Sequence, residues 1–257
     1  MNKSLILTVF IILLIFSPIF TAAVSAQNFN IPDISFEISN NDAQNNEGED
    51  LVLSLRILLL LTVLSLAPAI IVLFTSFTRI IIVFSILKRA LSLNNMPPNQ
   101  VLIGIAIFLT IFIMAPVLQG INQDALQPYL NEEISLENAY ENTITPIRSF
   151  MFKQVDERSL SLFAEMAEID RPESRQDLPT YVLIPAFLIN EIKIAFQIGF
   201  LLYIPFLMID MIVASILMSM GMMMLPPVII SLPFKILLFV LADGWHLLIG
   251  SLVETFN

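Results

Sequence analysis

Residues 178–240 read LPTYVLIPAFLINEIKIAFQIGFLLYIPFLMIDMIVASILMSMGMMMLPPVIISLPFKILLFV. Apolar stretches of this length exceed the roughly 20 residues that a helix needs to cross a bilayer. The whole chain of 257 residues agrees, with 57% apolar and 13% charged residues, against about 45–50% and about 25% in soluble domains. Glycine is scarce (7) and phenylalanine abundant (20), which favours helices over a barrel of short alternating strands. The sequence therefore predicts an all-α, multi-helix membrane protein.

Several classes of site are excluded or disfavoured by composition. The chain has no cysteine, which excludes disulfides, thiolate metal sites and a cysteine nucleophile. It has one histidine and no HExxH, P-loop or Gly-rich dinucleotide motif. The net charge of −10 argues against binding nucleic acid. We expect no catalytic residue, no metal and no cofactor.

The N-terminal region is typical of a secreted precursor. Residues 1–26 combine Lys3, an apolar run and a small-residue cleavage site, so we predict a signal peptide cleaved after Ala26. The alternative is an uncleaved first membrane span. Residues 27–50 hold six acids and no base, which predicts a flexible acidic extracytoplasmic leader.

Residues 51–119 predict a first helical hairpin, with spans over 51–76 and 101–118. Its turn, 79–99, carries Arg79, Lys88 and Arg89 in a stretch without acids, so the positive-inside rule assigns it to the cytoplasm. That orientation agrees with a mature N-terminus outside. Prolines within the apolar segments predict kinks or breaks, at Pro68, Pro116, Pro205 and Pro226-Pro227.

The remaining chain predicts two further regions. Residues 120–180 are polar and acidic but show helical periodicity, which predicts a small extracytoplasmic helical region with a helix starting at Pro146 after Thr145 as N-cap. Residues 181–257 predict a second helical hairpin with a Met-rich loop at 218–227. The hairpin is followed by a C-terminal interfacial helix near Trp245.

Four charged residues interrupt the apolar second hairpin: Glu191, Lys193, Asp210 and Lys235. An ionisable group in lipid costs a few kcal/mol, so it usually faces protein or water and has a partner. Glu191 and Lys235 are a candidate pair, within or between subunits. A proton or ion relay is one interpretation, and a salt bridge that specifies assembly is the favoured one.

Methionine occupies five of the seven positions from 218 to 224, around Gly221 and before a Pro-Pro pair. Methionine side chains are flexible and polarizable, and they adapt to irregular surfaces. Such a loop could close a pore against ions and yet yield to a passing polypeptide. The alternative is ordinary core methionine in a membrane bundle.

Long motifs in this chain resemble the FliP family of flagellar export-gate proteins. They are PAFLINEIKIAFQIGF at 185–200 and PFLMIDM at 205–211, followed by VAS at 213–215 and MSMGMMMLPP at 218–227. TSFTRI at 75–80 and the helix start NQV at 99–101 are similar to the family as well. The resemblance covers roughly residues 51–250. Asn190 departs from the family, which more often has Ser or Thr there.

The resemblance implies a non-enzymatic role. FliP-like proteins form a pentamer that joins FliQ-like and FliR-like membrane subunits in the type III secretion export gate of the inner membrane, in the flagellar basal body. Unfolded flagellar subunits pass outward through it, driven by the proton motive force. The family's methionine gasket falls on Met220, Met222, Met223 and Met224, and its intersubunit charges on Glu191 and Lys235. The signal peptide favours the flagellar branch over the virulence-secretion branch.

Two other function classes are compatible with the residues alone. An ion- or proton-coupled small-solute transporter would use Asp210 and Glu191 as coupling residues. An intramembrane enzyme would need a second catalytic group beside Asp210, and the sequence offers none.

Overall fold

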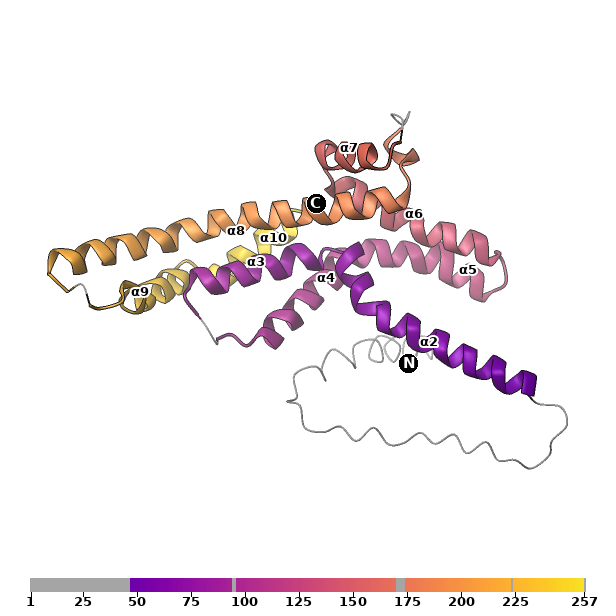
Figure 1. Cartoon of the computed structure of the whole chain (residues 1–257), viewed down its shortest axis with the longest axis horizontal. Helices are drawn as coiled ribbons and strands as arrows, with labels where there is room; N and C mark the ends of the chain where they lie inside the picture. Colours follow the sequence, from indigo (N-terminus) through magenta and orange to yellow (C-terminus); the bar gives the residue numbers. More distant parts are fainter. Residues whose placement is uncertain (1–46, 94–95, 170–173, 223, 257) are drawn as a thin grey trace, which may run out of the picture. The chain divides into compact units, whose positions relative to one another are not determined.

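The computed structural model describes residues 47–93, 96–169, 174–222 and 224–256 (Figure 1). Every regular element in this part of the chain is a helix, so the all-α prediction is confirmed. The signal peptide with its cleavage site at Ala26, the leader up to residue 46, and Met223 lie outside the described residues.

The helices follow one another along the chain with short connections. They are α2 (Glu47–Phe74), α3 (Phe77–Ala90), α4 (Asn99–Ile121), a π-helical turn (Asn122–Leu126), α5 (Gln127–Leu130), α6 (Leu136–Gln154), α7 (Glu157–Met166), a 3₁₀ turn (Arg175–Asp177), α8 (Thr180–Ser219), α9 (Pro227–Leu241) and α10 (Gly244–Glu254).

The chain divides into two units at residues 70 and 71. The first unit, where it is described, is most of α2, whose residues are apolar on all sides after Asp50 apart from Arg56 and a few hydroxyls. The second unit contains α3 to α10 and all of the contacts discussed below.

Two continuous helical stretches are long and apolar enough to cross a membrane, Asn99–Leu130 and Thr180–Ser219. The number rises to four if α2, which is bent beside Pro68, and the bent pair α9–α10 each cross as one span. These helices qualify by their length and apolar composition.

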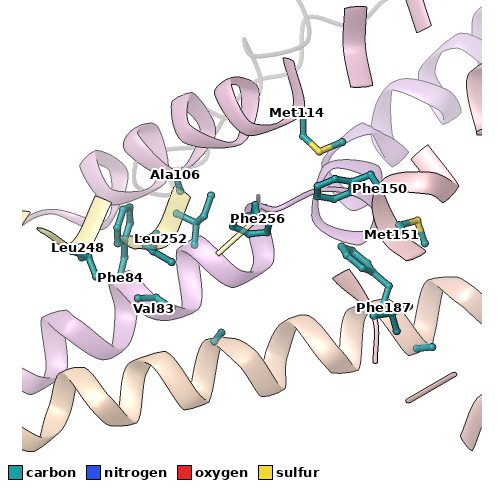
Figure 2. Close-up of a cluster of buried hydrophobic side chains, with 14 of the residues drawn as sticks. Val83, Phe84, Ala106, Met114, Phe150, Met151, Phe187, Leu248, Leu252 and Phe256 are labelled. Carbon is teal, nitrogen blue, oxygen red and sulfur yellow. The ribbon is translucent and has the colours of Figure 1, made fainter. Parts of the chain in front are cut away.

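The core of the second unit forms where α3 lies along α8 (Figure 1). Ile80, Val83, Phe84 and Leu87 are spaced at i, i+3, i+4 and i+7 and are at most 1% exposed, so α3 presents one apolar stripe. Figure 2 shows side chains from several other helices that belong to the same buried cluster as this stripe. They include Ala106, Phe150, Phe187, Leu248, Leu252 and Phe256.

A glycine allows α3 and α8 to approach closely. A Cβ added at Gly199 would overlap the side chain of Ile86 and lie 3.1 Å from the Ile86 Cβ. Small residues at helix crossings have this role in membrane proteins, because close backbone approach maximises packing.

Helix α8 has two halves with different surroundings. Eight residues are buried within 180–200 and three within 201–219. The near half, residues 180–200, packs against α3, α6 and α7, whereas the far half, residues 201–219, has α9 running back along it (Figure 1). Large apolar side chains on the far half are therefore exposed within the single chain, among them Leu201, Met208, Met211 and Ile212.

Two expectations about prolines were wrong. Pro116 and Pro205 do not break the apolar segments, because α4 and α8 continue through them. Helices in apolar surroundings tolerate proline when neighbours compensate the lost hydrogen bond. Pro226-Pro227 does separate two helices, with Pro227 at the first position of α9, where its missing N–H is not needed.

The predicted helix start at Pro146 was also wrong. Helix α6 begins ten residues earlier, at Leu136, where the Ser135 hydroxyl accepts a hydrogen bond from the Asn138 N–H. Thr145 lies inside the helix, and its hydroxyl donates to the Glu141 carbonyl. Leu136, Ala139, Tyr140 and Ile144 already recur at helical spacing, but Pro146 was interpreted as a first-turn proline, so the predicted helix began too late.

Candidate functional site

The first candidate site is an ion pair in the core, between α3 and the near half of α8. The Arg79 Nε donates to Glu191 Oε2 at 3.0 Å, and Nη2 donates to Glu191 Oε1. Both residues are 0% exposed. A bidentate guanidinium–carboxylate contact is the geometry in which a buried pair best offsets its desolvation.

The same guanidinium also holds the C-terminal end of the chain. Arg79 Nη1 donates to the carbonyl and hydroxyl oxygens of Thr255, each at 3.0 Å, and Nη2 donates to Gln154 Oε1 at 3.0 Å. The Phe256 ring lies 3.8 Å from Arg79 Cζ, close enough for a cation–π contact. Gln154 in turn donates to the Phe256 carbonyl. Arg79 thus connects α3, α6, α8 and the residues after α10.

Asn190 joins this network from the next position on α8. Its side-chain amide donates to the backbone carbonyl of Gln154 at 2.5 Å, and the residue is 2% exposed. The amide links α8 to the end of α6.

The second candidate site lies between α9 and the far half of α8. Lys235 Nζ donates to Asp210 Oδ2 at 2.7 Å, to the Ala90 carbonyl at 3.1 Å and to Ser92 Oγ at 2.9 Å. The Ser231 hydroxyl donates to Asp210 Oδ1 at 2.5 Å. The Lys235 side chain is 1% exposed and that of Asp210 is 19% exposed, so the pair is open on the aspartate side.

The end of α3 is shaped to supply two of these acceptors. Ser92 adopts a left-handed conformation, φ +58°, and its N–H donates to the Arg89 carbonyl while the Leu93 N–H donates to the Lys88 carbonyl. This is a Schellman ending with serine at the position that usually holds glycine. The serine replaces glycine here with a hydroxyl that accepts from Lys235.

The predicted pair of Glu191 with Lys235 does not form within the chain. Asp210 follows Glu191 by 19 residues on one helix, which is about 28 Å at 1.5 Å per residue. Glu191 contacts Arg79, and Lys235 contacts Asp210. Pairing within the chain was wrong because Arg79 had been used only as evidence for membrane orientation and was not considered as a partner for Glu191. Pairing of Glu191 with Lys235 between subunits stays a prediction.

Lys193 belongs to a third, exposed pair. Its Nζ donates to Asp156 Oδ2 at 2.6 Å, with the two side chains 46% and 35% exposed. Asp156 also caps α7, because its Oδ1 accepts from the Ser159 N–H at 2.8 Å. The hydrogen bond from Lys193, and then those from Ser159, lower the pKa of Asp156 from the usual 3.8 to about 2.

The methionine loop begins where α8 ends. Gly221 has φ +73°, its N–H donates to the Met218 carbonyl, and the Met222 N–H donates to the Leu217 carbonyl. This second Schellman ending requires the conformational freedom of glycine. The described gasket candidates are exposed within the chain: Met220 at 66%, Met222 at 41% and Met224 at 97%.

Neither ion-pair site has the parts of a catalytic or metal centre. Among the described residues, no group of three His, Asp or Glu side chains is arranged to hold a metal ion. Sequence reasoning missed Arg79, Gln154, Ser92 and Ser231. Arg79 alone had a usable signal, because it is a cation inside an apolar helical stripe and therefore requires a buried acid.

Arg79, Glu191, Asp210 and the methionine turn lie in the stretches that carry the family resemblance. The sequence model of the FliP family matches residues 60–252, about three quarters of the chain. The chain belongs to the FliP family. The flagellar biosynthetic protein FliP of Bacillus subtilis is 55% identical over 216 residues, covering 84% of this chain and 98% of that protein. The protein of the same name from Treponema denticola is 44% identical over 274 residues and covers both chains fully, and that from Aquifex aeolicus is 49% identical over 210 residues, covering 81% and 88%.

Proposed function

We propose that this member of the flagellar biosynthetic FliP family is a pore-forming core subunit of the flagellar type III protein export gate. It is inserted as a multi-pass protein in the inner membrane and exports unfolded flagellar subunits. It acts without a catalytic residue, as a homopentamer with FliQ-like and FliR-like subunits. The signal peptide, cleavage after Ala26 and an extracytoplasmic N-terminus are parts of the same proposal.

The length of α8 supports assembly with other subunits. Its 40 residues extend about 60 Å at 1.5 Å per residue, twice the ~30 Å hydrocarbon thickness. A straight crossing would leave half of the helix outside the lipid. Because the far half exposes large apolar side chains such as Met208 and Ile212, it needs a protein surface wherever it leaves the lipid.

The exposed methionine turn is the observation that carries the proposal. Met220, Met222 and Met224 lie where the chain reverses from α8 to α9 (Figure 1), and they are 66%, 41% and 97% exposed. Around a symmetry axis, five such turns would place flexible apolar side chains in one ring. Methionine can fill an irregular closed ring and rearrange when a polypeptide enters.

Fewer charged residues now support the predicted membrane orientation. Arg79 is neutralised by Glu191 in the core, so the positive-inside argument rests on Lys88 and Arg89. Both lie in the last turn of α3. The proposal therefore puts the connection between α3 and α4 on the cytoplasmic side.

Deleting residues 222–224 tests the gasket directly. We expect the deletion, in an assembled complex reconstituted in liposomes, to raise the leak of small ions by at least tenfold. Deleting residues 131–133, an exposed turn between α5 and α6, is the matched control and should leave the membrane as tight as the parent complex does. An assembled 222–224 deletion that stays ion-tight would remove the gasket from the proposal.

The transporter alternative uses Asp210 and Glu191 as coupling residues. The two lie about 28 Å apart along α8, and each is paired with a cation, which gives no support to a shared coupling site within one chain. The symmetry of the purified particle separates the two functions, because a gate requires a ring of chains around one axis. A particle in which each chain encloses its own substrate site would contradict the gate.

A further inference from the structure

A groove of about 400 Å³ lies between the end of α3 and the start of α4. One part of its lining is polar and the other is apolar. The polar part comprises Ser85, Lys88, Arg89 and Asn99, and the apolar part comprises Ile81, Leu93, Leu102 and Ile103. We call it the basic groove.

The basic groove has positive charge without a compensating acid nearby in the sequence. Residues 51–123 contain no Asp or Glu. Neither Lys88 nor Arg89 is in an ion pair among the described residues, where salt bridges involve Arg79, Lys193 and Lys235. Lys88 is half-buried and Arg89 is exposed, so both charges are available to a ligand.

These cations do not serve to cap α3, which is the usual role of basic residues in a last helical turn. The carbonyls of Leu87, Lys88 and Arg89 accept from backbone N–H groups of the following turn. The carbonyl of Ala90 accepts from Lys235. The last carbonyl groups of α3 therefore have hydrogen-bond donors without the side chain of Lys88 or Arg89.

Lys88 instead extends to the beginning of α4. Its Nζ donates to Asn99 Oδ1 at 2.9 Å, and Asn99 is the first residue of α4, whose N-cap, Pro98, offers no side-chain acceptor. A helix N-terminus carries partial positive charge. An anion placed between Lys88 and this N-terminus would interact favourably with both.

We propose that the basic groove binds an anionic phospholipid. Lys88, Arg89 and the start of α4 receive the headgroup phosphate, and one acyl chain follows the wall formed by Leu93, Leu102 and Ile103. A phospholipid fits because α4 is a candidate membrane span, and a crossing that begins at Asn99 would put its first turn at the level where headgroups meet hydrocarbon. Basic pockets between membrane helices are known to hold such headgroups. The inference does not depend on the export function.

The test uses the full chain, purified in detergent and delipidated. Phosphatidylglycerol and phosphatidylcholine with the same acyl chains are added separately, and bound lipid is counted by native mass spectrometry. We expect phosphatidylglycerol to bind at least tenfold more tightly than phosphatidylcholine. The double substitution Lys88→Gln/Arg89→Gln should remove that preference, and Lys153→Gln/Arg158→Gln, which neutralises two exposed cations elsewhere, should keep it within twofold.

Two further measurements test whether a simple anion occupies the groove and whether misfolding explains a loss of lipid binding. Inorganic phosphate at matched concentration should not compete; full competition would mean an anion site without a lipid and would overturn the proposal. Ile103→Trp fills the apolar wall and keeps both cations, so it should weaken phosphatidylglycerol at least fivefold. Unchanged phosphatidylglycerol affinity in the Ile103→Trp variant, or unchanged lipid preference in the Lys88/Arg89 variant, would also overturn the proposal. Displacement of the lipid by an acidic peptide at equal concentration would overturn it as well.

Discussion

The near and far halves of α8 have similarly apolar sequences but differ in how much of each is buried within the chain. Near-half residues such as Leu183, Phe187 and Ala195 are 0% exposed among α3, α6 and α7. Far-half residues such as Leu201 and Met211 are more than half exposed. The difference teaches that hydrophobicity alone does not say what a helix face contacts. The near half completes the fold of the chain, and the far half presents an apolar face that a single chain leaves uncovered.

The two buried ion pairs show the same difference. Arg79 and Glu191, on the near-half side, are enclosed, and the guanidinium directs hydrogen bonds to three residues. Lys235 is enclosed as well, but its partner Asp210 keeps 19% of its side chain exposed. The first pair is a part of the core, whereas the second is open toward whatever covers the far half.

The largest expected effect comes from removing the acid of each pair. Glu191→Ala leaves the Arg79 charge buried without a counter-ion, and breaking a buried pair in this way costs about 3–5 kcal/mol. Asp210→Ala leaves Lys235 with two neutral acceptors, Ala90 and Ser92, beside an opening to solvent, so we expect about 1–3 kcal/mol. Denaturant unfolding of the purified full chain measures both values.

A double substitution serves as the control for the near-half pair. Arg79→Met/Glu191→Leu removes both charges, and apolar replacement of a buried pair is often close to neutral. It should recover most of the stability lost in Glu191→Ala, less the hydrogen bonds to Gln154 and Thr255. If Glu191→Ala and Asp210→Ala lower the free energy of unfolding by the same amount, the different burial of the two ion pairs does not affect stability.

A smaller effect is expected where α3 and α8 cross. Gly199→Ala places a methyl group against Ile86, whose whole side chain must move because its Cβ is only 3.1 Å away. Overpacking of this kind costs about 1–3 kcal/mol, and the better helix propensity of alanine offsets about 0.5–1 kcal/mol of it. Thermal unfolding should therefore show a lower midpoint for the variant.

Gly104 in α4 is the matched position. A Cβ there meets no atom within 4 Å, so Gly104→Ala should be neutral or slightly stabilising. If Gly199→Ala unfolds at the same temperature as Gly104→Ala, the close approach of α3 to the near half does not limit stability.

Local patterns predicted part of the fold. The break after α8 was expected, because Gly221 and the Pro-Pro pair interrupt the helix. Residues 79–99 were expected to form a turn, but Phe77–Ala90 form α3. The helical spacing of Ile80, Val83, Phe84 and Leu87 was a usable signal that the turn prediction did not use. The start of α6 was missed because Pro146 was interpreted as a first-turn proline, although apolar residues at helical spacing begin at Leu136. The continuity of α8 through Pro205 was missed because it depends on tertiary neighbours.

The charged residues of the site were identified by type, but their partners were not. Arg79 and Glu191 are separated by 112 residues, and spacing along one helix carries no information about a partner so distant in sequence. Counting charges per apolar helix would have helped, because a cation in the core stripe of α3 needs an acid from another helix. The acceptor Ser92 had no signal, since its role depends on a left-handed backbone conformation.

The smallest expected effect concerns Asp156, which attaches α7 to the near half through Lys193. Its pKa is depressed to about 2 from 3.8, so the charged form is stabilised by folding. The contribution is fully present above about pH 4 and is lost as pH falls through about 2. Because the side chain is 35% exposed, solvent screening reduces the contribution to about 1 kcal/mol or less.

Two substitutions separate the charge of Asp156 from its role as a helix cap. Asp156→Asn keeps an oxygen that can accept from the Ser159 N–H and loses the ion pair, so it should unfold at nearly the parent temperature near pH 2 and slightly below it at pH 7. Asp156→Ala loses the cap as well, at a cost of about 1 kcal/mol at both pH values. If Asp156→Asn loses as much stability as the parent when the pH is lowered from 7 to 2, other carboxylates cause that loss. In that case the contact between α7 and the near half would owe its stability to apolar packing alone.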